Sequence, residues 1–229
     1  MQTAWKAFYN TVAVPILYTG FQALAFFNPK VRQGLLGRQS VFESLTEQLA
    51  TARSFDRTAW FHFTSVGEFE QAKPLIDHLY PQTRIILTYF SPSVAANARR
   101  YPLADAAIYL PLDSQQNAQR LFDLIQPSAL IFSKFDIWPN LVWEAKRRQI
   151  PVALIAGTLQ PNSKRLQPVV SAFFRSVHQE IDLHCVISEQ DAVRFSQLCP
   201  PAARIEVTGD TRFDRVYNRA LVVPDDEAF

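Results

Sequence analysis

The chain has 229 residues, of which 48% are hydrophobic and 19% are charged, and its net charge is +2. A chain of this length forms one large domain or two small ones and can bury a core. Its high hydrophobic and low charged content excludes a disordered protein. The small net charge gives no indication of a nucleic-acid partner. The six glycines form neither G-x-G-x-x-G nor G-x-x-x-x-G-K-[ST], so both of these phosphate-binding loops are excluded.

Thiols and imidazoles are also scarce in this sequence. Cys185 and Cys199 are the only cysteines, too few and too far apart for a zinc-ribbon or thioredoxin motif. The lack of a disulfide framework is typical of a reducing compartment. The four histidines are His62, His78, His178 and His184. They form no H-E-x-x-H motif, so we expect packed or surface histidines and no metal site.

The N-terminal segment is basic and apolar. Residues 1–42 contain Lys6, Lys30, Arg32 and Arg38 but no acidic residue, and residues 7–29 are uncharged. We expect a helix over residues 3–27 that anchors the chain at a membrane, followed by a basic cluster that faces anionic headgroups. A cleaved signal peptide is the second interpretation. A spanning helix and the buried helix of a soluble domain are weaker alternatives.

From residue 58 onward, short β-branched or aromatic runs alternate with helical patterns. The alternation predicts a Rossmann-like α/β fold, a parallel sheet with helices on both faces. The expected strands are Thr58–Phe63, Arg84–Tyr89, Ala106–Tyr109, Ser128–Ser133, Pro151–Ala156, Asp182–Ile187 and Arg204–Thr208. The expected helices are Glu68–Leu79, Ser93–Arg100, Ser114–Ile125, Pro139–Arg148, Arg165–Gln179 and Glu189–Leu198.

Chemistry in such a sheet is expected beyond the carboxyl ends of its strands. Four connections there carry unusual polar groups: residues 64–68, 89–93, 133–138 and 157–158. The first places Gly67 and the carboxylate of Glu68 where a helix begins. Such a carboxylate caps the helix, or it accepts a proton from a substrate hydroxyl, and by itself the pattern favours capping.

Several of these segments resemble one family, the 3-deoxy-D-manno-octulosonic acid (Kdo) transferases of lipopolysaccharide synthesis. Ser-x-Gly-Glu followed by an acid-Ile-Trp-Pro-Asn run is the most specific part, and a Gly37-Arg38 element behind an N-terminal anchor is also similar. The matching stretches are residues 60–68, 88–93, 109–113, 136–140, 148–152 and 207–214.

The resemblance implies the N-terminal, acceptor-binding half of a GT-B glycosyltransferase that transfers Kdo from CMP-Kdo to a lipid A precursor. It implies that Glu68 is the general base, that no metal or other cofactor is needed, and that the protein lies on the cytoplasmic side of the inner membrane. The expected substrate-binding residues are Arg38, Ser65, Gly67, Ser91, Ser93, Lys134 and Asp136.

Two features of the sequence depart from the family pattern. Many members have Glu-x-Glu before the Ile-Trp-Pro-Asn run, whereas this chain has Lys134-Phe-Asp136, which puts any role at position 134 in doubt. We expect an anchor at residues 1–29, the acceptor domain at 30–215 and the start of a linker at 216–229, with the CMP-Kdo domain absent. The alternatives are a membrane-associated lipid-binding module without activity, and a different transferase on the same architecture.

Overall fold

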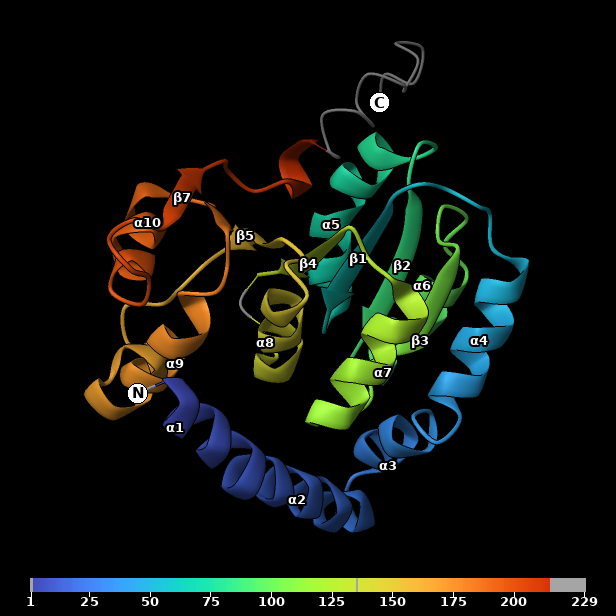
Figure 1. The fold of residues 1–229 in the computed structure, drawn as a ribbon, viewed down its shortest axis with the longest axis horizontal. Coiled ribbons are helices and arrows are strands. Elements are labelled where there is room, and N and C mark those ends of the chain that lie inside the picture. The colour runs from blue at the N-terminus through green and yellow to red at the C-terminus, as the bar shows by residue number, and fades with distance from the viewer. Residues whose placement is uncertain (1, 135, 215–229) are drawn as a thin grey trace, which may run out of the picture.

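The protein is a seven-stranded parallel sheet covered by helices, seen in a computed structural model that describes residues 2–134 and 136–214 (Figure 1). The strand order is β3-β2-β1-β4-β5-β6-β7, and every neighbouring pair is parallel. The strands are β1 Thr58–Phe63, β2 Arg84–Tyr89, β3 Ala106–Tyr109, β4 Ala129–Ser133, β5 Val152–Gly157, β6 Leu183–Val186 and β7 Arg204–Val207. The doubly wound α/β prediction is confirmed, and the predicted linker at 216–229 lies outside the described residues.

Side chains alternate between the two faces of the sheet and build two cores. On β1, the Trp60 ring packs edge-on against Phe122 of α7 at 5.1 Å between centroids. The Phe63 ring stacks on Phe69 of α5 on the opposite face at 4.6 Å. Because both faces are covered, the central strands are mostly apolar, as is typical of a buried parallel sheet.

The helices that connect the strands lie close to their predicted positions. They are α5 Val66–Leu79, α6 Pro92–Arg99, α7 Gln115–Ile125, α8 Pro139–Arg147, α9 Pro168–His178 and α10 Glu189–Ser196. Two boundaries need correction. Helix α5 begins at Val66, so Gly67 is inside its first turn and is not a turn before the helix. Helix α9 begins at Pro168 and not at Arg165, because the residue before a proline disfavours helical backbone, and residues 164–166 form a separate 3₁₀ turn.

Two short helices, α3 Pro29–Leu36 and α4 Val41–Thr51, were not among the predicted elements. Asn28 caps α3 by accepting hydrogen bonds from the backbone N–H groups of Lys30 and Val31 at 3.0 and 3.3 Å. Helix α4 buries Val41 and Leu45 against the α7 face of the sheet. These two helices connect the N-terminal segment to the sheet.

The N-terminal segment is helical from Gln2 to Phe27, as α1 Gln2–Phe8, a π-helical turn η1 Tyr9–Ala13 and α2 Val14–Phe27. The backbone N–H of Val14 bonds to the carbonyl of Tyr9, directly before Pro15, which has no N–H to donate. The predicted helix is confirmed. It passes the ends of α9, α8 and α7 and reaches α3 below the carboxyl edge of the sheet (Figure 1).

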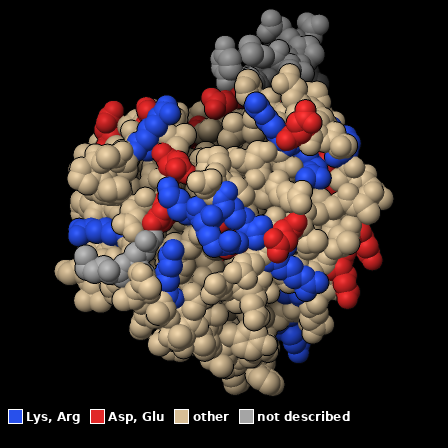
Figure 2. All heavy atoms as spheres, viewed as in Figure 1, with Lys and Arg blue, Asp and Glu red and all other residues tan. Residues whose placement is uncertain are grey.

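The surface of α2 is unusually apolar for a helix that covers little of the core. Phe26 and Phe27 are 85% and 88% exposed, and Ile16, Tyr18 and Leu24 are also exposed. Figure 2 shows almost no charged side chains over α2, whereas lysine and arginine gather over α8 higher on the same face. By length and composition, Thr3–Phe27 is able to cross a membrane, which is weak support for the predicted anchor.

Candidate functional site

The candidate site lies where the strand order reverses, between β1 and β4. In open parallel sheets, ligands bind at the carboxyl edge beside this reversal. The segment after β1 carries Thr64, Ser65 and Glu68, and the segment after β4 carries Lys134 and Asp136. The Ser133 hydroxyl donates to the Glu68 carbonyl at 3.0 Å and joins the two segments.

Glu68 forms a capping box at the N-terminus of α5. Its Oε2 accepts hydrogen bonds from the backbone N–H groups of Thr64 at 2.6 Å and Ser65 at 3.2 Å. In return, the Ser65 hydroxyl accepts from the Glu68 N–H at 3.4 Å. Both bonds to the carboxylate use Oε2, and within the described part of the chain Oε1 accepts none. The capping interpretation is therefore confirmed, and one carboxylate oxygen keeps its acceptor capacity.

Charged neighbours act on the Glu68 carboxyl in opposite directions. Burial raises its pKa above the usual value, the hydrogen bond from Thr64 opposes this, and Asp136 raises it further. The hydrogen bond from Ser65 and the attraction of Lys134 lower the pKa. Asp136, from the segment after β4, also accepts a hydrogen bond from the Thr64 hydroxyl. Both carboxylates are therefore hydrogen-bonded to the loop that follows β1. The predicted residues Glu68, Ser65, Lys134 and Asp136 thus form one cluster.

Lys134 adopts an unusual backbone conformation, with φ at 71° in the left-handed region. Its N–H donates to the Ile155 carbonyl at 2.7 Å, which continues the β4–β5 pairing by one residue. A side chain in this region costs about 1–2 kcal/mol, and such strain is concentrated at functional sites. The reversal of charge at position 134 relative to the family pattern therefore occurs at a strained position within the cluster.

Arg165 is a member of the cluster that the sequence did not reveal. It lies in the 3₁₀ turn after β5, its guanidinium is 5.1 Å from the Phe174 ring centroid, and burial lowers its pKa while Asp136 opposes that change. Thr64, which donates to Asp136, was also not predicted as a site residue. No sequence signal marks either residue, because a lone arginine or threonine in a loop is common.

Arg38 is placed beside the site, but its guanidinium is held by the protein. Nε donates to the Leu110 carbonyl, Nη1 to that of Gly34 and Nη2 to that of Phe90, each at 2.7 Å. The guanidinium also stacks on the Phe90 ring, 4.2 Å from its centroid. Gly37 is required next to it, because a Cβ there would lie 2.4 Å from the Tyr109 ring. Arg38 therefore fixes α3 to the carboxyl edge.

Ser91 and Ser93 form the N-terminal cap of α6. The Ser91 hydroxyl accepts from the Ser93 N–H at 3.3 Å and lies 2.9 Å from the Ser93 hydroxyl. The Ser91 N–H donates to the Thr64 carbonyl at 3.1 Å, and the N–H of Phe90 donates to Phe63. Backbone hydrogen bonds thus join this loop to the segment that leads to Glu68.

The Ile-Trp-Pro-Asn run holds the edge of the sheet together. The Trp138 indole donates to His62 Nε2 at 2.9 Å and stacks on the Phe90 ring at 4.9 Å. Burial lowers the pKa of His62 to about 3, so its imidazole is neutral and accepts this bond. Asn140 donates from its side chain to the Asp113 carbonyl at 2.8 Å and to Asn10 Oδ1 at 3.0 Å. These residues fix the geometry of the site and the position of the N-terminal helix.

Two hollows lie between the N-terminal helices and the sheet. The larger has a volume of about 620 Å³ and contains Arg32 and Arg38 among apolar residues of α2, α3 and the segment after β3. The smaller, of about 200 Å³, has Lys30 and Ser91 at an apolar wall that includes Phe21 and Phe90. A hollow with apolar walls and a few cationic groups suits a ligand with acyl chains and phosphates.

A family model described as 3-deoxy-D-manno-octulosonic-acid transferase (kdotransferase) matches residues 38–215, from the arginine of the Gly-Arg element to the end of the last predicted stretch. The chain belongs to this family. The resemblance inferred from the motifs is confirmed, and these enzymes are glycosyltransferases.

Curated Kdo transferases match over different lengths. The chain is 35% identical to the 3-deoxy-D-manno-octulosonic acid transferase of Chlamydophila psittaci over 159 residues, which is 67% of this chain and 37% of that protein. It is 31% identical to that of Aquifex aeolicus over 160 residues, covering 67% and 40%. It is 24% identical to that of Haemophilus influenzae over 226 residues, covering 95% and 51%. The chain thus spans about half or less of these relatives.

Solved structures support the fold at low sequence identity. A UDP-N-acetylglucosamine 2-epimerase aligns with a TM-score of 0.52 and 18% identity, over 76% of this chain and 52% of that one. A UDP-GlcNAc 2-epimerase from Neisseria meningitidis aligns with a TM-score of 0.50 over 72% and 51%. The likeness agrees with one half of a GT-B-like architecture.

Proposed function

We propose that this chain is the acceptor-binding half of an enzyme that transfers Kdo from CMP-Kdo to a lipid A precursor in lipopolysaccharide synthesis. The CMP-Kdo would be bound by a second domain. Glu68 is the general base, and the chain acts at the cytoplasmic side of the inner membrane. The observation that carries the proposal is the Glu68 carboxylate at the strand-order reversal, held through Oε2 with Oε1 left to accept a proton.

The proposed reaction requires the protein to accept one proton from the substrate. Glu68 accepts the proton of an acceptor hydroxyl while the hydroxyl oxygen bonds to the anomeric carbon of Kdo. The bond from that carbon to the phosphate oxygen of CMP breaks, and CMP leaves with the electron pair. Burial raises the pKa of Glu68, which strengthens it as a base, and the attraction of Lys134 opposes part of that rise.

The proposed acceptor site is the pair of hollows beneath the N-terminal helices. Lys30 and Arg32 are exposed at their edges, where they are available for phosphates of the acceptor, and α2 and α3 supply apolar walls for acyl chains. Phe90 and Ser91 belong to the smaller hollow and are hydrogen-bonded to the loop before Glu68. An acceptor there would contact a loop that is hydrogen-bonded to the loop before the base. Arg38 contributes by positioning these walls.

The test of the base is Glu68→Gln in the two-domain enzyme that carries this chain. Glutamine keeps the capping bonds to Thr64 and Ser65 but does not accept a proton, so kcat is expected to fall by ~10²–10⁴ with little change in melting temperature. Glu70→Gln, on the same helix, is the matched control and should keep normal turnover. Near-normal turnover by Glu68→Gln would show that the residue is only a cap.

The test of acceptor binding uses the 229-residue chain itself. Lys30→Ala combined with Arg32→Ala should weaken binding of a bisphosphorylated lipid A precursor, and the affinity of the wild type should fall with salt. Binding without turnover by this chain alone is also what a lipid-binding module predicts. Equal affinity for the phosphorylated and dephosphorylated precursor would show that the basic residues contact only bulk anionic lipid.

A further inference from the structure

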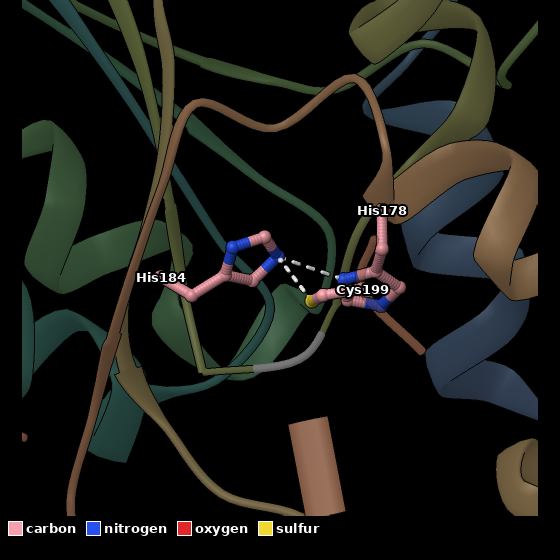
Figure 3. Close-up of side chains that lie close together, drawn as sticks. All are labelled: His178, His184 and Cys199. Carbon is pink, nitrogen blue, oxygen red and sulfur yellow. Dashed lines mark hydrogen bonds between the residues drawn. The ribbon is translucent and has the colours of Figure 1, made fainter. Parts of the chain in front are cut away.

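A second cluster of reactive side chains lies away from the candidate site, inside the last part of the sheet. His178 is the last residue of α9, His184 is on β6, and Cys199 follows α10. All three are buried, with exposed fractions of 2%, 0% and 9%. Their donor atoms lie within 4.8 Å of one another, and Figure 3 shows them directed at a common point.

The distances in the cluster are close to those of ligands around one metal ion. His178 Nδ1 is 3.0 Å from His184 Nε2, and Cys199 Sγ is 3.5 Å from the same nitrogen. Bond lengths of about 2.0 Å for imidazole and 2.3 Å for thiolate place neighbouring tetrahedral ligands ~3.3–3.6 Å apart. His178 Nδ1 and Cys199 Sγ lie within 4.8 Å of each other, so a closure of up to roughly 1 Å between them would bring all three atoms to bonding distance.

Hydrogen bonding alone leaves this cluster poorly satisfied. Neutral imidazole has one lone pair, on His184 Nε2, and both His178 Nδ1 and Cys199 Sγ approach it. His184 Nδ1 then carries the proton and faces the backbone of Arg204 on the neighbouring strand, which favours the protonated nitrogen and leaves Nε2 as the free lone pair. A cation at the common point would instead use the lone pairs of all three atoms.

We propose that His178, His184 and Cys199 form a buried binding site for one thiophilic d¹⁰ metal ion, Zn²⁺ or Cu⁺. Binding displaces the Cys199 thiol proton to solvent, places the His178 proton on Nε2 and leaves that of His184 on Nδ1. Two imidazoles and a thiolate are donors that both ions accept. With Cu⁺ the complex is neutral, which suits a dry site with three donors, whereas Zn²⁺ would add a fourth ligand.

The site would stabilise the edge of the sheet. It joins α9, β6 and the connection from α10 to β7, and β7 itself is mostly exposed. The rings of His178 and His184 are stacked, and Phe195 packs against both at 5.7 and 5.9 Å. An ion at this position would fix the last strand–helix unit, and Phe174, whose ring contacts both His178 and Arg165, lies between it and the candidate site.

The test is metal binding by the 229-residue chain after removal of metals with a chelator. Titration with Zn²⁺, or with Cu⁺ under reducing conditions, should give about one equivalent per chain and a higher melting temperature. The ion that is retained in competition with a chelator identifies the metal. Co²⁺ should produce a thiolate-to-metal charge-transfer band.

Cys185 offers a matched control, because it follows His184 on β6 but is directed to the opposite face of the sheet. Cys199→Ser should weaken metal binding by at least about tenfold and abolish the Co²⁺ band, whereas Cys185→Ser should keep both. In the wild type, the bound ion should slow alkylation of Cys199 and leave that of Cys185 unchanged. Failure of both ions to bind, or equal binding by Cys199→Ser, would overturn the proposal.

Discussion

Gly67 is a residue for which a structural role and a role in binding can be told apart. It lies in the first turn of α5, beside the cap that Ser65 and Glu68 form. The atom nearest to an added Cβ is the Ser65 hydroxyl oxygen at 3.9 Å, which is ordinary contact. Neither the backbone nor the packing of the described residues requires glycine here. A ligand that approaches the helix N-terminus would require it.

Gly67→Ala is therefore expected to separate folding from binding. Alanine favours helix over glycine, so the free energy of unfolding should stay constant or rise by up to about 1 kcal/mol. The KM for the acceptor should rise, because the methyl group occupies the approach to the N–H groups of α5. Urea unfolding and steady-state kinetics of the two-domain enzyme measure the two effects. An unchanged KM would remove Gly67 from the substrate-binding set.

Lys134 combines backbone strain with an electrostatic effect on Glu68. Lys134→Ala and Lys134→Gly both remove the ammonium group that lowers the pKa of Glu68. In both variants the pKa should rise, so the limb of the pH–rate profile that increases with pH should move to higher pH. Glycine also relieves the left-handed strain, so Lys134→Gly should be about 1 kcal/mol more stable than Lys134→Ala. An identical pH profile in wild type and variants would contradict the electrostatic role.

At the level of elements, the N-terminal helix is joined to the sheet through a buried polar network. The Tyr9 hydroxyl donates to Asp113 Oδ2 at 2.9 Å, and the Asn140 N–H donates to the same oxygen at 3.0 Å. The backbone N–H of Leu141 also acts on this carboxyl, and all three donors lower its pKa. Burial is the larger effect and raises the pKa of Asp113 to about 7, so burial favours the protonated carboxyl against the pull of its hydrogen-bond donors.

The raised pKa of Asp113 predicts a loss of stability as pH rises from about 4 to about 7. The folded protein holds the Asp113 proton up to about pH 7, whereas the unfolded chain releases it near pH 4. Stability should therefore fall as pH rises through this interval, by up to roughly 4 kcal/mol. The side chain in Asp113→Asn does not titrate, so the free energy of unfolding of this variant should depend less on pH. The check is chemical denaturation of both proteins from pH 4 to 8, and parallel curves would be contrary to the expectation.

At the level of the whole molecule, apolar and charged surfaces are separated. The face of α2 carries exposed aromatic and aliphatic side chains, and the cationic residues Lys30 and Arg32 follow it directly. The last turn of α8 carries Lys146 and Arg147, with side chains 54% and 60% exposed. An apolar helix with flanking cations is the pattern of a helix that lies at a lipid surface.

Phe26 and Phe27 are the most exposed of these apolar residues, so Phe26→Ser combined with Phe27→Ser tests the lipid contact without removing the helix. Burial of one phenylalanine contributes about 1.5–3 kcal/mol, so binding to anionic vesicles should weaken at least tenfold. The melting temperature should stay constant. Val169→Ser, a 76% exposed position on α9, is the control. Unchanged sedimentation with vesicles would exclude α2 as the contact.

Local patterns in the sequence determined the strands, most of the helices and the capping role of Glu68. Strand periodicity, cap residues and prolines act within a few residues, so the order of β and α elements follows from them. The N-terminal helix was predicted from another local feature, an apolar and uncharged segment flanked by basic residues. Helices α3 and α4 were not predicted, because they lie outside the strand–helix alternation that begins at residue 58.

The tertiary structure alone decided which distant residues meet. Only the strand order brings Lys134 and Asp136 beside Glu68, because β4 pairs with β1 across 70 residues of chain. Tertiary structure also brings the carbonyls that accept hydrogen bonds to Arg38, and it brings Arg165 near Asp136. It likewise brings His178, His184 and Cys199 together. Such contacts depend on the path of the chain through the sheet, which no short window of sequence encodes.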